Sequence, residues 1–190
     1  MNRLVSLLFV LPAGVLAQEP PVAEGLAAWS RIYEVASHPR CTNCHVGDSG
    51  RPAWAALGYD PKWLHGMNVQ AGDSRIGAET VLCQTCHITA ASDNATPHAA
   101  PQIDDAWRLP PVALDWRDKT SGEICIQMRN PETNNGFEGQ ELAAHVRESA
   151  FVNWGFEPGG NRVPAPGTAE ELARDIEVWI AAGTPCTADP

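Results

Sequence analysis

Apolar residues recur every three to four positions in four stretches of the chain, and this spacing is typical of helices with one buried face. Two of the stretches open on a threonine with a glutamate three residues later, Thr120 with Glu123 and Thr168 with Glu171, which is the spacing of a capping box. The predicted helices cover about 22–37, 121–130, 138–149 and 169–183. We therefore expect a mainly α protein.

Two long segments between these helices, 46–81 and 88–111, are rich in glycine, proline and polar residues and have no sustained period. No stretch alternates convincingly enough to predict a strand. Loops of this length lose much conformational entropy when they become ordered, so they normally need a partner that stabilises them. Large cofactors are one kind of partner that long loops can wrap around.

The first 17 residues predict an export signal that is removed from the mature protein. Arg3 provides a short positive region, an apolar run follows from Leu4 to Val10, and small residues lead to Ala17. The alternative, an uncleaved anchor, is disfavoured because the run is shorter than the roughly 20 residues that span a bilayer. We expect one domain over 18–190, located in the periplasm and without a membrane span.

The charge of the chain is strongly acidic, with 13 lysines and arginines against 23 aspartates and glutamates. Removal of the signal takes Arg3 and no acid, so the imbalance grows in the mature protein. Such a chain has little with which to displace counterions from phosphate, which argues against nucleic-acid binding. It fits a carrier whose field steers it toward basic patches on protein partners.

The pentapeptide pattern CxxCH occurs twice, as CTNCH at 41–45 and CQTCH at 83–87. In c-type cytochromes the two cysteines form thioethers to the haem and the adjacent histidine ligates the iron. Zinc binding and a thioredoxin-like redox pair are the alternatives, and both fit less well, because the histidine is adjacent in both copies and no βαβ pattern surrounds them. We expect two covalent haem c groups, whose predicted attachment and ligand residues are Cys41, Cys44 and His45 for the first and Cys83, Cys86 and His87 for the second.

Each motif supplies only one face of its iron, so a second ligand must come from elsewhere. His65 lies in a glycine-containing loop before the second motif, and His145 lies on the apolar face of a predicted helix. Both are the favoured candidates for iron ligands. The remaining alternatives are His38, His98, Met67 and Met128.

Cys125 and Cys186 stand apart from the two motifs, in what look like separate helical segments. In an exported protein such a pair predicts a disulfide, here one that closes the C-terminal half. Two buried free thiols are the alternative. The seven tryptophans are mostly expected to wall the haem pockets, where large aromatic rings exclude water.

Several strings carry a resemblance to a known family: ASHPRCTNCH, SGEIC, an AHV-type helix, VNWGFEPG, and PAPGTAEE followed by a final cysteine. Together they resemble small exported dihaem cytochromes described as cytochrome subunits associated with isoquinoline oxidoreductase. The resemblance runs from about Ser37 to Cys186. It implies electron transfer, with a periplasmic molybdenum hydroxylase or another dehydrogenase as donor and a separate terminal acceptor. The family pattern also includes His38, His65, His145, Cys125 and Cys186, whereas Met128 stands where an aliphatic residue is expected, which favours histidine on both faces of each iron.

A second, local resemblance covers only about 65–87 and is to the small dihaem subunit of periplasmic nitrate reductase. It implies that His65 ligates the second haem, which leaves His145 for the first. The chain departs from that family in its long helical C-terminal part and in having no clear upstream histidine for the first haem.

The sequence therefore predicts an electron carrier, or an electron-transfer subunit of an oxidoreductase, that is not itself an enzyme. The alternative is a dihaem peroxidase-like enzyme with one open iron position. Such enzymes are generally much longer, and two enclosed haems leave this chain little room for a substrate pocket. A haem-based sensor or scaffold component is a third, weaker hypothesis.

Overall fold

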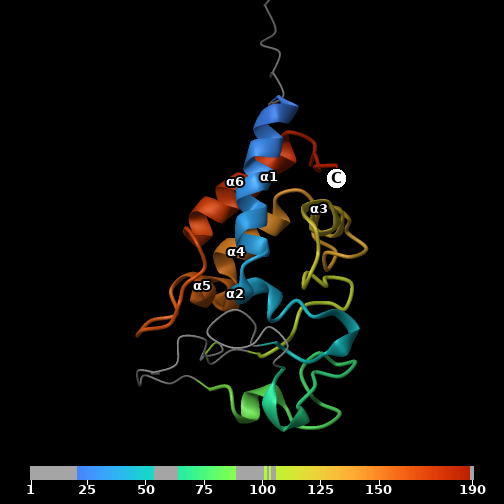
Figure 1. The fold of residues 1–190 in the computed structure, drawn as a ribbon, viewed down its shortest axis with the longest axis vertical. Coiled ribbons are helices and arrows are strands. Elements are labelled where there is room, and N and C mark those ends of the chain that lie inside the picture. Colours follow the sequence, from blue (N-terminus) through green and yellow to red (C-terminus); the bar gives the residue numbers. More distant parts are fainter. Residues whose placement is uncertain (1–20, 54–63, 89–100, 102, 104–105, 189–190) are drawn as a thin grey trace, which may run out of the picture.

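The computed structural model describes residues 21–53, 64–88, 101, 103 and 106–188, and these residues are mainly helical (Figure 1). The predicted export signal lies outside them. Over the described ranges, no helix is both long enough and apolar enough to cross a membrane. The only β pairing recorded in this part of the chain is a bridge between Ala53 and Leu64. The helices are α1 (Val22–Ala36), α2 (Pro39–Thr42), α3 (Ser121–Arg129), α4 (Glu141–Glu148), α5 (Ala150–Phe156) and α6 (Ala169–Ala181), and the 3-10 turns are η1 (Gly47–Ser49), η2 (Gly66–Asn68) and η3 (Cys83–Thr85).

The helical core forms around α6, which packs against both α1 and α4 (Figure 1). Trp29 of α1 and Trp179 of α6 are almost fully buried, and their ring centres lie 5.2 Å apart. Close approach is needed at Gly25, where a Cβ atom would run into Ala182 and Pro185 of the C-terminal segment. The two ends of the described chain are therefore packed together, far from the loops.

Helix α3 is attached to this core by a disulfide and a polar contact. Cys125 is bonded to Cys186, with their Cα atoms 5.7 Å apart, so the expected pairing is present. The indole of Trp29 donates a hydrogen bond to the Ser121 hydroxyl at 2.8 Å. The predicted capping box is also formed: the Thr120 hydroxyl accepts from the backbone N–H of Glu123, and the Glu123 carboxylate accepts from that of Thr120.

Two short helices were not expected, and each has a local cause. Pro39 lies just after the predicted helix over 22–37 and begins α2, because proline is well suited to the first helical position. Helix α5 lies where the sequence predicted the end of one helix and the start of a loop. The Ser149 hydroxyl caps α5 by accepting from the backbone N–H of Val152, and Phe156 is buried at its other end. Helix α4 is correspondingly shorter than the predicted 138–149.

The loop segments gather at one end of the helical core, below α2 in Figure 1. Backbone hydrogen bonds join segments far apart in sequence: Leu109 N–H to the carbonyl of Arg75 at 2.8 Å, and Trp116 N–H to that of His45 at 3.0 Å. A small second core, separate from the helical one, contains Val46, Ala71 and Leu109. Both CxxCH motifs belong to this end of the molecule. The mainly α fold is thus present, with its loops brought together around the two motifs.

Candidate haem-binding sites

The two motifs adopt the same local turn. In each, the second cysteine and the histidine both donate their backbone N–H to the carbonyl of the first cysteine: Cys44 and His45 to Cys41 at 3.1 and 3.0 Å, and Cys86 and His87 to Cys83 at 3.2 and 3.0 Å. This turn places the two thiols of a motif near one another, with the histidine directly after them. The sequence repeat is therefore also a structural repeat.

The thiols of the two motifs differ in burial. Burial raises the pKa of the Cys41 thiol to about 12 and that of Cys44 to about 11. The pKa of Cys83 is also raised by burial, whereas Cys86 is exposed. The first motif is thus enclosed by the helical core and loops, and the second lies nearer the surface of the described structure.

The ring of His45 is held in one orientation. It stacks on the indole of Trp116, with ring centres 3.5 Å apart and planes within 5°. Its Nδ1 lies 3.2 Å from the Leu114 carbonyl oxygen. Burial lowers the pKa of His45 to about 3, so the ring is neutral and Nδ1–H donates to that carbonyl. A neutral imidazole whose Nδ1 is bonded to a carbonyl has its Nε2 lone pair ready to ligate a metal.

His145 is the expected far-side ligand of the first haem, and its charge contributes to the lowered pKa of His45. The His145 ring stacks against Phe137, with centres 4.8 Å apart. It is accessible to solvent, yet the protein around it still lowers its pKa by desolvation.

His87 has equivalent supports in the second motif. Its ring centre lies 4.1 Å from that of Trp107, and it makes a hydrogen bond with the Pro101 backbone. Trp107 in turn meets the ring of Phe151, in α5, edge to face at 5.0 Å. Desolvation lowers the pKa of His87, and the charge of His65 lowers it further. The short helix that the sequence missed is therefore the element that supports the second site.

His65 and His87 approach each other at a distance that suits a shared metal. Their ring centres are 6.0 Å apart and their planes meet at 63°. Two imidazoles on opposite sides of a metal, with metal–nitrogen bonds of about 2 Å each, have ring centres about 6 Å apart. The Nδ1 of His65 makes a hydrogen bond with the Gly66 carbonyl at 2.9 Å, which fixes the orientation of its ring beside His87. The residues fit a haem iron between them.

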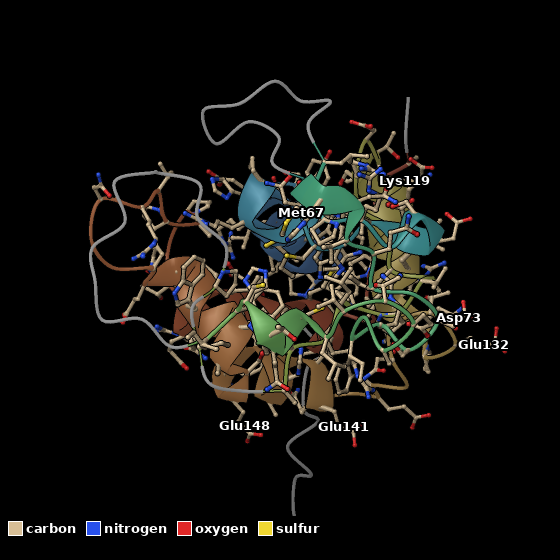
Figure 2. The ribbon with its side chains drawn as sticks, turned by 90° about the horizontal axis from the view of Figure 1, so that it is seen from below. Met67, Asp73, Lys119, Glu132, Glu141 and Glu148 are labelled. Carbon is tan, nitrogen blue, oxygen red and sulfur yellow. A yellow bond between two sulfur atoms is a disulfide. The ribbon has the colours of Figure 1, made fainter. Side chains whose placement is uncertain are left out.

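The other predicted candidates are placed less suitably, and His98 lies outside the described residues. The Nδ1 of His38 accepts the backbone N–H of Arg40 as the cap of α2. Met128 is 5% exposed and belongs to the helical core. Met67 is 85% exposed and lies at the surface of the loop end, where Figure 2 labels it. Neither methionine side chain approaches a motif histidine in any contact given for the described residues.

Four nitrogen donors around the two sites are buried without a hydrogen-bond partner. They are Nε1 of Trp107, Nε1 of Trp116, Nη2 of Arg75, and Nε of Arg51, whose Nη2 donates to the His65 carbonyl at 3.4 Å. The two indoles are the rings that lie against the motif histidines. The expectation that most tryptophans wall the pockets is not met by the described ones: Trp29 and Trp179 pack in the helical core, Trp154 lies under the Arg40 guanidinium, and Trp54 and Trp63 lie outside the described residues. No sequence pattern distinguishes Arg75 from the other arginines.

Comparisons with family models, with curated proteins and with solved structures found no match to this chain. The resemblance stated from the sequence motifs is therefore still a prediction. Within the described residues, no three His, Cys, Asp or Glu side chains gather as they would around a structural zinc ion. A haem iron takes only two protein ligands, one on each face, and histidine pairs are what these residues form.

Proposed function

We propose that this chain is an exported dihaem c-type cytochrome, which transfers electrons between a dehydrogenase or another oxidoreductase and a downstream acceptor. The observation that carries the proposal is the approach of His65 to the CxxCH histidine His87, with their ring centres 6.0 Å apart. For the first motif the support is electrostatic: the charge of His145 contributes to the lowered pKa of His45. When bound, the two haems would supply one-electron oxidation and reduction.

The chain's own residues would hold the two groups as follows. Cys41 and Cys44 would attach the first haem, with His45 and His145 as its ligands. The second would be attached and ligated by Cys83, Cys86, His65 and His87. Histidine on both faces closes the iron to exogenous ligands, so this set favours electron transfer over peroxidase chemistry.

The carbonyls and indoles around the motif histidines would tune each site. The Leu114 carbonyl on His45 and the Pro101 backbone bond on His87 fix the orientation of the rings and make them stronger donors. Trp116 and Trp107 cover one face of these rings and exclude water. Such supports favour a ligand geometry that changes little between oxidation states, which suits rapid electron transfer.

The charge of the chain supports a redox partner with a basic surface. Seen from the loop end in Figure 2, the side chains of Asp73, Glu132, Glu141 and Glu148 project outward, as does that of Lys119. The acidic balance of the chain as a whole would steer encounter with a basic docking surface. A periplasmic molybdenum hydroxylase or another dehydrogenase is the class of donor that we propose.

Expression in a host that matures c-type cytochromes tests this function. We expect the intact mass to show two covalently bound haems, both low-spin and unchanged by carbon monoxide or cyanide. A matched Cys83→Ala/Cys86→Ala variant should carry one haem. A protein without covalent haem would refute the proposal, and one high-spin haem that turns over peroxide would favour the peroxidase-like alternative.

A further inference from the structure

Arg75 is a buried cation without a carboxylate partner among the described residues. It is 7% exposed. Its Nε donates to the Pro110 carbonyl at 2.9 Å and its Nη1 donates to the Gly47 carbonyl at 2.8 Å, but its Nη2 has no partner. Guanidinium groups stay charged, and burial of a charge is unfavourable unless an anion and hydrogen bonds compensate it. Among the described residues Arg75 has no direct ion pair; the Asp115 carboxylate lies against Gly47, and its Oδ1 is itself buried without a hydrogen-bond partner.

The backbone of Arg75 is also held in an unfavourable conformation. Its φ angle is 62°, in the left-handed region that favours glycine. Two hydrogen bonds keep it there: Arg75 N–H donates to the Gly72 carbonyl at 3.1 Å, and Leu109 N–H donates to the Arg75 carbonyl at 2.8 Å. Strained residues that the surroundings hold so firmly are concentrated at functional sites.

The guanidinium lies beside the first CxxCH motif. Its bond to Gly47 reaches the second residue after His45. A second unpartnered donor, Nε1 of Trp116, belongs to the ring stacked on His45. Two buried donors without acceptors thus flank the same histidine. Each haem carries two propionate carboxylates, which are acceptors of the kind that both donors lack.

We propose that Arg75 binds a propionate of the first haem through Nη2 and raises the reduction potential of that haem. This inference rests on the proposed function. Arginine suits the role because its planar group pairs with carboxylates through charge-assisted hydrogen bonds. A fixed positive charge near the iron favours the reduced state, which carries one positive charge less than the oxidised state.

Potentiometric titration of the haem-loaded protein tests the proposal. Arg75→Gln should shift the one-electron equilibrium of the first haem toward the oxidised form by roughly tenfold, which is about 59 mV. Arg75→Lys keeps the charge and should retain most of the potential. The matched control is Arg108→Gln, which removes the exposed arginine that precedes Leu109, the residue bonded to the Arg75 carbonyl, and should leave both haems unchanged. The Cys41→Ala/Cys44→Ala variant identifies which potential belongs to the first haem.

A shift of the second haem alone in Arg75→Gln would overturn the assignment, as would no shift of either haem. If the variants fail to fold, a crystal structure of the haem-loaded wild-type chain decides: Arg75 Nη2 must lie about 3 Å from a propionate oxygen of the first haem. A larger separation would refute the proposal. Absence of covalent haem from the wild-type protein would instead refute the proposed function, so the two failures are distinguishable.

Discussion

The imidazole rings of His65 and His87 meet edge to face with their centres 6.0 Å apart, although they come from different turns of the loop end. Each ring is held by the backbone: His65 by the Gly66 carbonyl and His87 by a bond with Pro101. The bridge between Ala53 and Leu64 fixes the chain immediately before His65. The pair is therefore positioned by backbone contacts and is ready to take a metal between its rings.

Replacement of His65 by alanine should convert one of the two haems from low-spin to high-spin. The haem should remain attached, because its thioethers come from Cys83 and Cys86. Electron paramagnetic resonance with optical spectra measures the change, as loss of half of the low-spin signal and appearance of carbon monoxide binding. Met67→Ala, on the same turn, is the matched control and should leave both spectra unchanged.

Two low-spin haems in the His65→Ala protein would show that another side chain ligates the second iron. His98, which lies outside the described residues, would then be the first candidate to replace. Comparison of His98→Ala with the double variant His65→Ala/His98→Ala then identifies the role of His98. A native His98 ligand is lost in the single variant, whereas a His98 that binds only when His65 is absent is lost only in the double variant.

Replacement of His145 by alanine should produce the equivalent change at the first haem. His145 stacks on Phe137, and its charge acts on His45, so it is the nearest described candidate for the far face of that iron. His38→Ala is the control: His38 caps α2 through Arg40 N–H, so its loss should cost about 1 kcal/mol of stability without changing the spin state. A spin-state change in His38→Ala, with none in His145→Ala, would reverse the assignment.

Periodicity in the sequence was sufficient for the main helices and insufficient for the short ones. Helices α1, α3 and α6 each bury one continuous face, and a buried helical face appears in the sequence as apolar residues that recur about every 3.6 positions. Helix α5 is only seven residues long, and it forms through the Ser149 cap and the burial of Phe156. Neither signal is periodic, so the tertiary contact decides the structure there.

The residues of the candidate site can likewise be separated into those with a local sequence pattern and those without one. The CxxCH spacing is local chemistry, and it was enough to choose His45 and His87. The supports of these rings come from distant, aperiodic loops: Trp116 and Leu114 for His45, and Trp107 for His87. Arg75 belongs to the same class, since only the folded chain shows that its charge is buried. Residues that act through long-range contacts do not recur at a regular spacing, so no sequence pattern identifies them.

Removal of the disulfide should destabilise the helical core without changing the haem spectra. Cys125 and Cys186 are 61 residues apart in sequence, and closure of a loop of this length lowers the entropy of the unfolded chain by an amount worth about 4 kcal/mol. Denaturant unfolding of Cys125→Ala/Cys186→Ala should show a loss approaching this value. Oxidised spectra of Cys125→Ala/Cys186→Ala that differ from those of the oxidised wild type would contradict the separation of core and haem sites.

Acid should weaken the contact between α4 and α6 through Glu170. Arg147 of α4 bonds to Glu170 at 2.8 Å and to Glu177 at 2.6 Å, and its first bond lowers the pKa of Glu170 below the ordinary value of 4.5. A carboxyl whose pKa is lower in the folded state binds fewer protons there than in the unfolded state. Its contribution is therefore complete above pH 4.5 and is lost as the pH falls through the folded-state pKa.

The measurement is the free energy of unfolding as a function of pH in wild type and in Arg147→Met. The wild-type protein should lose stability on acidification more steeply than the variant, because only the wild type holds the pKa of Glu170 down through Arg147. Arg129→Met, which removes an exposed arginine of α3, is the control and should keep the wild-type slope. The pKa of Glu123 is lowered by its capping-box bonds to Thr120 and so contributes equally to all three proteins. Equal slopes for wild type and Arg147→Met would show that this ion pair does not link the two helices in solution.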